Sequence, residues 1–200
     1  KTFEKGINLS KGDFIALSDQ DDYWIPEKIS KLVHGIGEAS LIYADSELVN
    51  ADGLPIGQKM SEIKRQIAYN SPIMYTFGAW APGHSMLFKR DLLAFALPTV
   101  DFVTHDYLIG FGATCANGIS YLPESLVHYR QHEKNTIGAN LRKAPKPYNS
   151  RNERNELILA RLDLIQKRCP TGKNKEILQA FSMACRGKNI LHRIDRVRIA

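Results

Sequence analysis

An apolar segment that stops at a cluster of carboxylates constrains this chain more than any other feature. Residues 14–17 (FIAL) are predicted to form a buried strand, and Asp19, Asp21 and Asp22 follow it directly. Pro26 then opens a predicted helix. Its apolar residues fall at helical spacing: Ile25, Ile29, Leu32 and Val33. In open α/β sheets ligands collect at the carboxyl ends of strands, so the segment predicts an α/β fold with a site at this strand end.

The three neighbouring carboxylates predict a bound cation. Like charges at this spacing repel one another, and a positive group between them removes the repulsion. Hard oxygen ligands favour Mg²⁺ or Mn²⁺. An EF-hand calcium loop starting at Asp19 is excluded, because its sixth position, which requires glycine, is Trp24 and its twelfth is Ser30.

Length and composition indicate one globular domain with a core of its own. The chain has 200 residues, which is enough to bury a sizeable core. No apolar run approaches the roughly 20 residues of a membrane helix, and the first residues do not form a signal peptide. Cys115, Cys169 and Cys185 are odd in number and lack CxxC spacing, which argues against a disulfide framework or a zinc site. This number and spacing of cysteines indicates a reducing, cytoplasmic location.

Charge is distributed unevenly along the chain. Residues 1–141 contain 12 Lys and Arg against 16 Asp and Glu, whereas residues 142–200 contain 15 against 5. Residues 142–151, with two prolines, indicate a linker, so we predict a body over 1–141 and a basic helical extension over 142–200. The extension is interpreted either as a contact for anionic lipid headgroups or another phosphate-bearing partner, or as a solvated helical face. The chain has no aromatic-rich motif, and no nucleic-acid partner is expected.

The remaining elements are predicted from periodicity and turn residues. We expect a short helix before Gly12, strands over 41–49, 54–56, 85–88 and 119–122, a turn at Pro123–Glu124, and helices starting at Thr104, Ser150 and about Lys175. Ser150 and Glu153 form a predicted capping box. Asp45 lies within the strand over 41–49, where a carboxylate is unusual, and is interpreted either as a residue near the site or as part of an exposed hairpin face.

Four segments of the chain resemble one protein family. Residues 18–29 (SDQDDYWIPEKI) closely resemble the metal-binding segment of family-2 glycosyltransferases, particularly the bacterial rhamnosyltransferase-like members. Residues 83–90 (GHSMLFKR), 105–108 (HDYL) and 129–132 (YRQH) resemble further motifs of the same family. The resemblance covers roughly residues 1–140. It implies a GT-A-like (Rossmann-like) mixed sheet flanked by helices, here with a C-terminal helical extension, and a family nucleotide-binding segment that would precede this chain.

The resemblance also implies roles for individual residues on the donor side. Asp21 would be the main metal ligand, with support from Asp19 and from His132 on a closing loop. Asp22 and Arg130 would join these residues in binding the donor diphosphate.

On the acceptor side, the resemblance implies that Asp106 is the general base, although an acidic residue at a helix start also serves simple capping. His84 and His105 would line the acceptor site. Trp80 would stack on a sugar ring there; the alternative is a buried tryptophan.

The expected activity is transfer of a sugar, rhamnose being the one suggested, from a dTDP- or UDP-linked donor to a hydroxyl of a glycan or lipid-linked acceptor. A single displacement would invert the anomeric centre, and the resembled enzymes build bacterial cell-surface polysaccharide. The protein would then work in the cytoplasm or peripherally at the inner face of the plasma membrane. The alternative is a non-catalytic fragment that acts as a binding or scaffold module.

Overall fold

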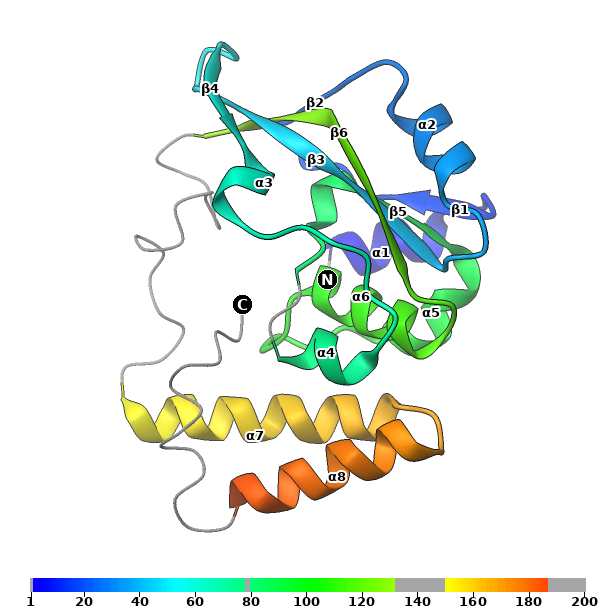
Figure 1. Ribbon diagram of the computed structural model, residues 1–200, viewed down its shortest axis with the longest axis vertical. Helices are drawn as coiled ribbons and strands as arrows, with labels where there is room; N and C mark the ends of the chain where they lie inside the picture. The colour runs from blue at the N-terminus through cyan, green and yellow to red at the C-terminus, as the bar shows by residue number, and fades with distance from the viewer. Residues whose placement is uncertain (1, 78–79, 132–149, 187–200) are drawn as a thin grey trace.

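The computed structural model describes residues 2–77, 80–131 and 150–186 and shows a mixed sheet with helices on both faces (Figure 1). The strands are β1 (Phe14–Ala16), β2 (Tyr23–Trp24), β3 (Leu41–Val49), β4 (Pro55–Lys59), β5 (Met86–Lys89) and β6 (Ile119–Arg130). The helices are α1 (Thr2–Leu9), α2 (Lys28–Gly35), α3 (Met60–Ile63), α4 (Pro72–Thr76), α5 (Leu93–Ala96), α6 (His105–Cys115), α7 (Arg151–Arg168) and α8 (Lys173–Arg186), with the 3-10 turns η1 (Gly83–Ser85) and η2 (Arg90–Leu92). The predicted α/β fold class is confirmed.

The sheet has the strand order β1-β5-β3-β6-β2, and β4 pairs with the end of β3. β3 and β6 are parallel, whereas β5 runs antiparallel to both β3 and β1. β1, β3 and β6 therefore point the same way. The acidic segment follows the carboxyl end of β1 and returns through β2, which pairs antiparallel with the end of β6.

Alternation along the central strands sends successive side chains to opposite faces of the sheet. Leu41 and Tyr43 of β3 belong to the core under α6, while Ile42 and Ala44 belong to the core under α2. Both faces are buried, which explains why β3 begins with the apolar residues 41–44 and ends with the apolar residues 48–49.

The predicted turn at Pro123–Glu124 is wrong, because β6 continues through it as one strand. The register shows why: Ala44 lies opposite Leu122, but the next residue of β3, Asp45, lies opposite Ser125. Pro123 and Glu124 are thus inserted as a bulge and point to solvent. A bulge accommodates proline because no ladder hydrogen bond is required of its nitrogen.

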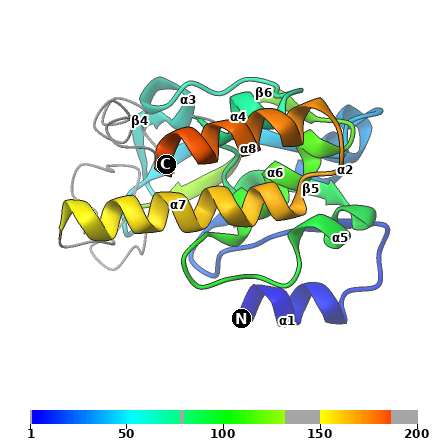
Figure 2. The same ribbon diagram turned by 90° about the horizontal axis from the view of Figure 1, so that it is seen from below.

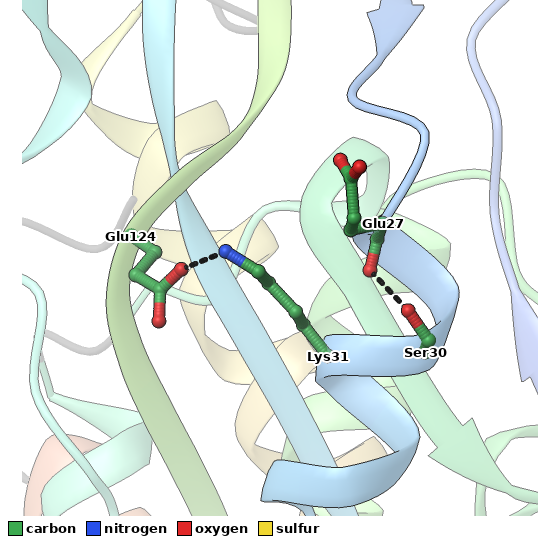
Figure 3. A network of polar contacts seen from close by, with 4 residues as sticks. All are labelled: Glu27, Ser30, Lys31 and Glu124. Atoms are coloured by element: carbon green, nitrogen blue, oxygen red, sulfur yellow. Dashed lines mark hydrogen bonds and ion pairs between the residues drawn. The ribbon is translucent and has the colours of Figure 1, made fainter.

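The apolar spacing predicts the helix at α2 but not its buried face. Ile29 and Val33 are 40% and 39% exposed, whereas Leu32 and Lys28 are both fully buried. α2 is tied to the bulge of β6 by an exposed ion pair between Lys31 and Glu124, while Ser30 Oγ donates to the Glu27 carbonyl at 2.9 Å (Figure 3). A lysine therefore occupies the inward position that an apolar residue would normally take.

The C-terminal helices pack on the same side of the sheet as α6. The Ser150 hydroxyl accepts a hydrogen bond from the Glu153 N–H at 3.2 Å, so the serine caps α7 as predicted. Ile158, Leu162 and Ile165 of α7 belong to the same core as α6. Figure 2 shows α7 and α8 side by side across this face. The predicted linker lies almost entirely outside the described residues, and the boundary at residue 141 stays a prediction.

None of the helices in the described parts of the chain is long and apolar enough to cross a membrane.

Candidate functional site

The acidic segment is held in place by hydrogen bonds on both sides. Asp22 Oδ1 accepts a hydrogen bond of 3.0 Å from the backbone N–H of Arg130, the last residue of β6. The Asp22 N–H in turn donates to the Asp19 carbonyl at 3.4 Å, which closes a turn between β1 and β2. Sheet pairing therefore fixes where these carboxylates lie.

Asp19 and Asp22 meet His84 of η1. One carboxylate oxygen of each aspartate and a ring nitrogen of His84 all lie within 4.8 Å of one another. The Asp21 carboxylate acts electrostatically on both aspartates, so it belongs to the same acidic group. The structure thus brings together residues predicted for the donor side and a histidine predicted for the acceptor side. His132 lies outside the described residues.

Burial controls the charge of this cluster. Burial, together with the charges of Asp19 and Asp21, raises the pKa of Asp22 to about 7, although the hydrogen bond from the Arg130 N–H acts in the opposite direction. The pKa of Asp19 is raised by the same burial and then by Asp21. Burial lowers the pKa of His84 to about 3, assisted by the positive charge of Lys28. His84 is therefore a neutral imidazole at neutral pH, the form that binds metals.

Two further contacts fix the His84 ring. Its Nε2 lies 2.9 Å from the Ser46 hydroxyl of β3, and both side chains are buried. Its face stacks on the Tyr129 ring of β6, with centroids 4.3 Å apart and planes 6° from parallel. Contacts with β3 and β6 thus fix the orientation of the imidazole ring.

Lys28 is the site residue that sequence reasoning missed. Its ammonium donates a hydrogen bond of 2.7 Å to the His84 carbonyl and lies 3.6 Å from the centroid of the Trp24 ring. Burial lowers its pKa to about 7, against the opposing effect of Asp22 and Asp19. The available signal was its position: Lys28 precedes Leu32 by four residues, on the inward stripe of an amphipathic helix.

Asp106 lies at the start of α6, one residue after the first helical position, and its Oδ1 accepts from the Tyr107 N–H at 2.8 Å. η1 approaches this helix end closely: a Cβ added to Gly83 would lie 3.4 Å from both Asp106 Cβ and His105 Nε2. Asp106 also contributes to the raised pKa of Asp19, after burial and Asp21. The helix start that carries Asp106 thus adjoins the turn that carries His84.

The side chains of His105 and Arg130 also contact residues outside the acidic cluster. The His105 ring stacks on Phe3 of α1 with centroids 4.1 Å apart, and burial lowers its pKa. The Arg130 guanidinium lies over the Tyr23 ring and donates to the Ala51 carbonyl at 3.2 Å. Its backbone faces the acidic cluster, while its side chain extends along the β3–β4 turn.

Trp80 is partly exposed and packs against Leu48, Met60 and Tyr129. The Lys64 ammonium lies 4.0 Å from the centroid of its ring. One face of the indole is therefore already next to a cation.

Asp45 is buried, so its interpretation as part of an exposed hairpin face is wrong. Its carboxylate accepts hydrogen bonds from the Ser46 N–H at 2.8 Å and from Ser61, through the N–H at 3.0 Å and the hydroxyl at 2.6 Å. These bonds satisfy the carboxylate and hold the first turn of α3 against β3.

The acidic cluster has the chemistry of a site for a hard divalent cation. Asp22 Oδ2 is buried, and no hydrogen-bond partner for it exists among the described residues. Buried carboxylate oxygens are rarely left without a partner, and an ion accounts for such an atom. Two carboxylates and a neutral imidazole suit Mg²⁺ or, with its greater tolerance for nitrogen, Mn²⁺.

No family profile matches the chain. In sequence, it is 28% identical over 149 residues to the dTDP-rhamnosyl transferase RfbG of Shigella flexneri, which covers 68% of this chain and 49% of that protein. It is also 28% identical over 109 residues to the uncharacterized glycosyltransferase YwdF of Bacillus subtilis (strain 168), covering 51% of this chain and 38% of that protein. The chain thus spans half or less of the length of these curated relatives.

Solved structures with a similar fold include residues 1–349 of TarS from S. aureus. The complex with UDP-GlcNAc superposes with a TM-score of 0.54 at 19% identity, over 91% of this chain and 51% of that one. The complex with UDP gives a TM-score of 0.50 at 16% identity, over 90% and 48%. In fold and in sequence, the chain thus resembles GT-A-like family-2 glycosyltransferases, rhamnosyltransferases among them.

Proposed function

We propose that this chain carries the cation site and the catalytic base of an inverting glycosyltransferase, which moves a sugar from a nucleotide diphosphate to an acceptor hydroxyl. The observation that carries the proposal is convergence on η1. Asp19 and Asp22, from the segment after β1, surround His84, and Asp106, from the start of α6, adjoins Gly83. A cation-binding group and a separate carboxylate next to each other are what such a displacement requires.

Asp19, Asp22 and His84 would hold Mg²⁺ or Mn²⁺, and Asp21, the main ligand expected from the sequence, stays a candidate ligand beside them. Bound there, the ion would neutralise the charge that develops on a diphosphate leaving group. His132 stays a candidate ligand from the sequence. Arg130 and Asp22 stay candidates for the donor side, and the Arg130 N–H donates a hydrogen bond to the Asp22 carboxylate.

Asp106 would take the proton of the acceptor hydroxyl as it attacks. The hydrogen bond from the Tyr107 N–H orients one oxygen of the Asp106 carboxylate. Attack on the face of the sugar opposite the leaving group inverts the anomeric centre. His105 and Trp80 would then contact the acceptor, a glycan or a lipid-linked sugar.

The donor class follows from the similar proteins. One relative is a dTDP-rhamnosyl transferase, and TarS was crystallised with UDP-GlcNAc and with UDP, so a dTDP- or UDP-sugar is proposed for this chain. By extension from the first of these relatives, we also propose that the sugar is rhamnose and that the reaction belongs to bacterial cell-surface polysaccharide synthesis. Contact of the basic C-terminal residues with anionic lipid at the inner membrane face is proposed from their charge alone.

Calorimetric titration of dTDP and UDP into the protein, with Mn²⁺ and with EDTA, tests the donor site. We expect Mn²⁺-dependent binding that is lost in Asp22→Asn and kept in Asp106→Asn. Donor hydrolysis or transfer in the same samples tests turnover. Binding without either reaction would favour the binding-module alternative, and absence of binding in the unmodified protein would contradict the proposed donor site.

A further inference from the structure

Lys28 is a buried cation whose hydrogen-bonding capacity is only partly used. Its side chain is fully buried, and within residues 2–77, 80–131 and 150–186 its ammonium makes one hydrogen bond, to the His84 carbonyl. One side of the ammonium faces the Trp24 ring. An ammonium has three N–H donors, so donors remain for another acceptor.

Asp22, a residue of the acidic cluster, has an acceptor oxygen that is likewise unused. Its Oδ2 is buried without a hydrogen-bond partner in the described parts of the chain, and no direct hydrogen bond joins it to the Lys28 ammonium. The two charges nevertheless act on each other electrostatically, as Lys28 and Asp19 also do. Opposite charges are thus kept close but not paired.

This arrangement costs folding free energy, and a role in the site would explain why the protein keeps it. Burying an ammonium is unfavourable without full pairing, and apolar side chains of similar size usually replace such groups without loss of stability. Leu32, one turn further along the same face of α2, is an apolar residue of this kind and is fully buried. Violations of this kind concentrate at functional sites.

We propose that Lys28 is the built-in counter-cation of the acidic cluster: it holds Asp19 and Asp22 next to His84 while no divalent ion is bound, and it weakens the binding of that ion. The inference rests on the cation site of the proposed function. The ammonium is anchored to the main chain of His84, a residue of the cluster, so it stays beside the site when the ion enters. Its repulsion then keeps the ion exchangeable.

The test measures melting temperature and Mn²⁺ affinity in EDTA-treated protein titrated with Mn²⁺. Lys28→Met removes both the charge and the hydrogen bond, Lys28→Gln removes the charge but keeps an N–H donor, and Lys28→Arg keeps the charge. Lys31→Gln is the matched control, because Lys31 lies on the same helix with a side chain that is 44% exposed and pairs with Glu124.

We expect Lys28→Met and Lys28→Gln to bind Mn²⁺ at least about fivefold more tightly than the unmodified protein, because a nearby positive charge is gone. At equal free Mn²⁺, that gain raises their Mn²⁺-induced shift in melting temperature by about 2–4 °C. Lys28→Arg and Lys31→Gln should respond like the unmodified protein.

Three outcomes would overturn the inference. An equal or weaker Mn²⁺ response in Lys28→Gln means that the charge does not oppose the ion, and the proposed function is then untouched. A stronger response in Lys28→Met alone assigns the effect to the lost hydrogen bond. No Mn²⁺ response in any of the proteins, the unmodified one included, removes the cation site itself and the proposed function with it.

Discussion

The backbone N–H of Arg130 donates a hydrogen bond of 3.0 Å to the Asp22 carboxylate, which lies 108 residues earlier in the chain. The bond follows from sheet pairing, since Tyr23 lies opposite His128 and Trp24 opposite Val127 in the β2–β6 register. Oδ1 of Asp22 is thereby fixed by the sheet, whereas Oδ2 is buried without a hydrogen-bond partner among the described residues. The sheet thus prepares the cluster before any ion arrives.

Asp22→Asn should weaken Mn²⁺-dependent nucleotide binding at least about tenfold, because an amide is a poorer ligand than a carboxylate for a hard ion. Calorimetry with and without Mn²⁺ measures the change. Asp45→Asn is the matched control: this carboxylate is also buried but is fully hydrogen-bonded to Ser46 and Ser61. It should lower the melting temperature and leave Mn²⁺ dependence intact. Normal Mn²⁺ dependence in Asp22→Asn would contradict the ligand assignment.

Asp106→Asn should reduce transfer about 10²–10⁴-fold, the usual contribution of a general base, while nucleotide binding is retained. Initial rates with a saturating donor measure the loss. The exposed Asp101, five residues earlier, provides the control, and Asp101→Asn should keep full activity. Equal loss of binding and transfer in Asp106→Asn would remove the base assignment and leave a structural role at the start of α6.

His84 should make an acid-sensitive contribution to the stability of the metal-free fold, which Asp22 opposes between pH 7 and 4 because its raised pKa of about 7 favours proton uptake by the folded chain. Burial lowers the pKa of His84 from 6.5 to about 3, so below pH 6.5 the unfolded chain binds a proton that the folded one excludes. The stability that this provides is complete above pH 6.5, and falls by about 1.4 kcal/mol for each pH unit down toward 3.

Urea unfolding in EDTA at several pH values measures this dependence. Between pH 6.5 and 4, His84→Gln should make the slope of stability against pH less positive by about 1.4 kcal/mol per pH unit, and His34→Gln, at an exposed histidine, should leave the slope unchanged. An unchanged slope in His84→Gln would show that His84 is not the titrating group.

Arg168 should stabilise the attachment of α7 to the body. Its guanidinium donates to the carbonyls of Phe95, at 3.0 Å, Ala96, at 2.8 Å, and Pro98. Arg168→Met should therefore cost about 1–2 kcal/mol of unfolding free energy, because charged hydrogen bonds are lost at a partly exposed position. Urea unfolding measures the cost. Lys167→Met, at the exposed neighbouring position, should change stability little, and a similar loss in both variants would argue against the specific contacts.

Gly110 leaves room in α6 for Tyr75. A Cβ built on Gly110 would overlap the buried Tyr75 hydroxyl, so Gly110→Ala should displace that ring and destabilise the fold by about 1–3 kcal/mol despite the higher helix propensity of alanine. Thermal unfolding checks this result. Gly6→Ala in α1 adds a Cβ with nothing within 4 Å, and it should be neutral or stabilising. Two equally stable variants would show that Tyr75 moves without cost.

Several features could be predicted from the sequence because they depend on neighbouring residues. The periodicity of residues 14–33 and 41–49 and the capping serine at Ser150 correctly indicated two strands, a helix and a helix start. Local spacing also placed Asp19 and Asp22 after a strand and Asp106 at a helix start.

Long-range packing decided the rest. Whether Pro123 turns the chain or bulges depends on the pairing of β6 with β3, and whether Asp45 is exposed depends on where α3 begins. Lys28 and His84 could not be joined from the sequence, because the bond between them spans 56 residues. Periodicity reports only that a face is buried. The sequence thus determined the elements and the acidic segment, whereas the tertiary structure decided which side chains complete the site, because burial and charge at that point are set by chain segments that are distant in sequence.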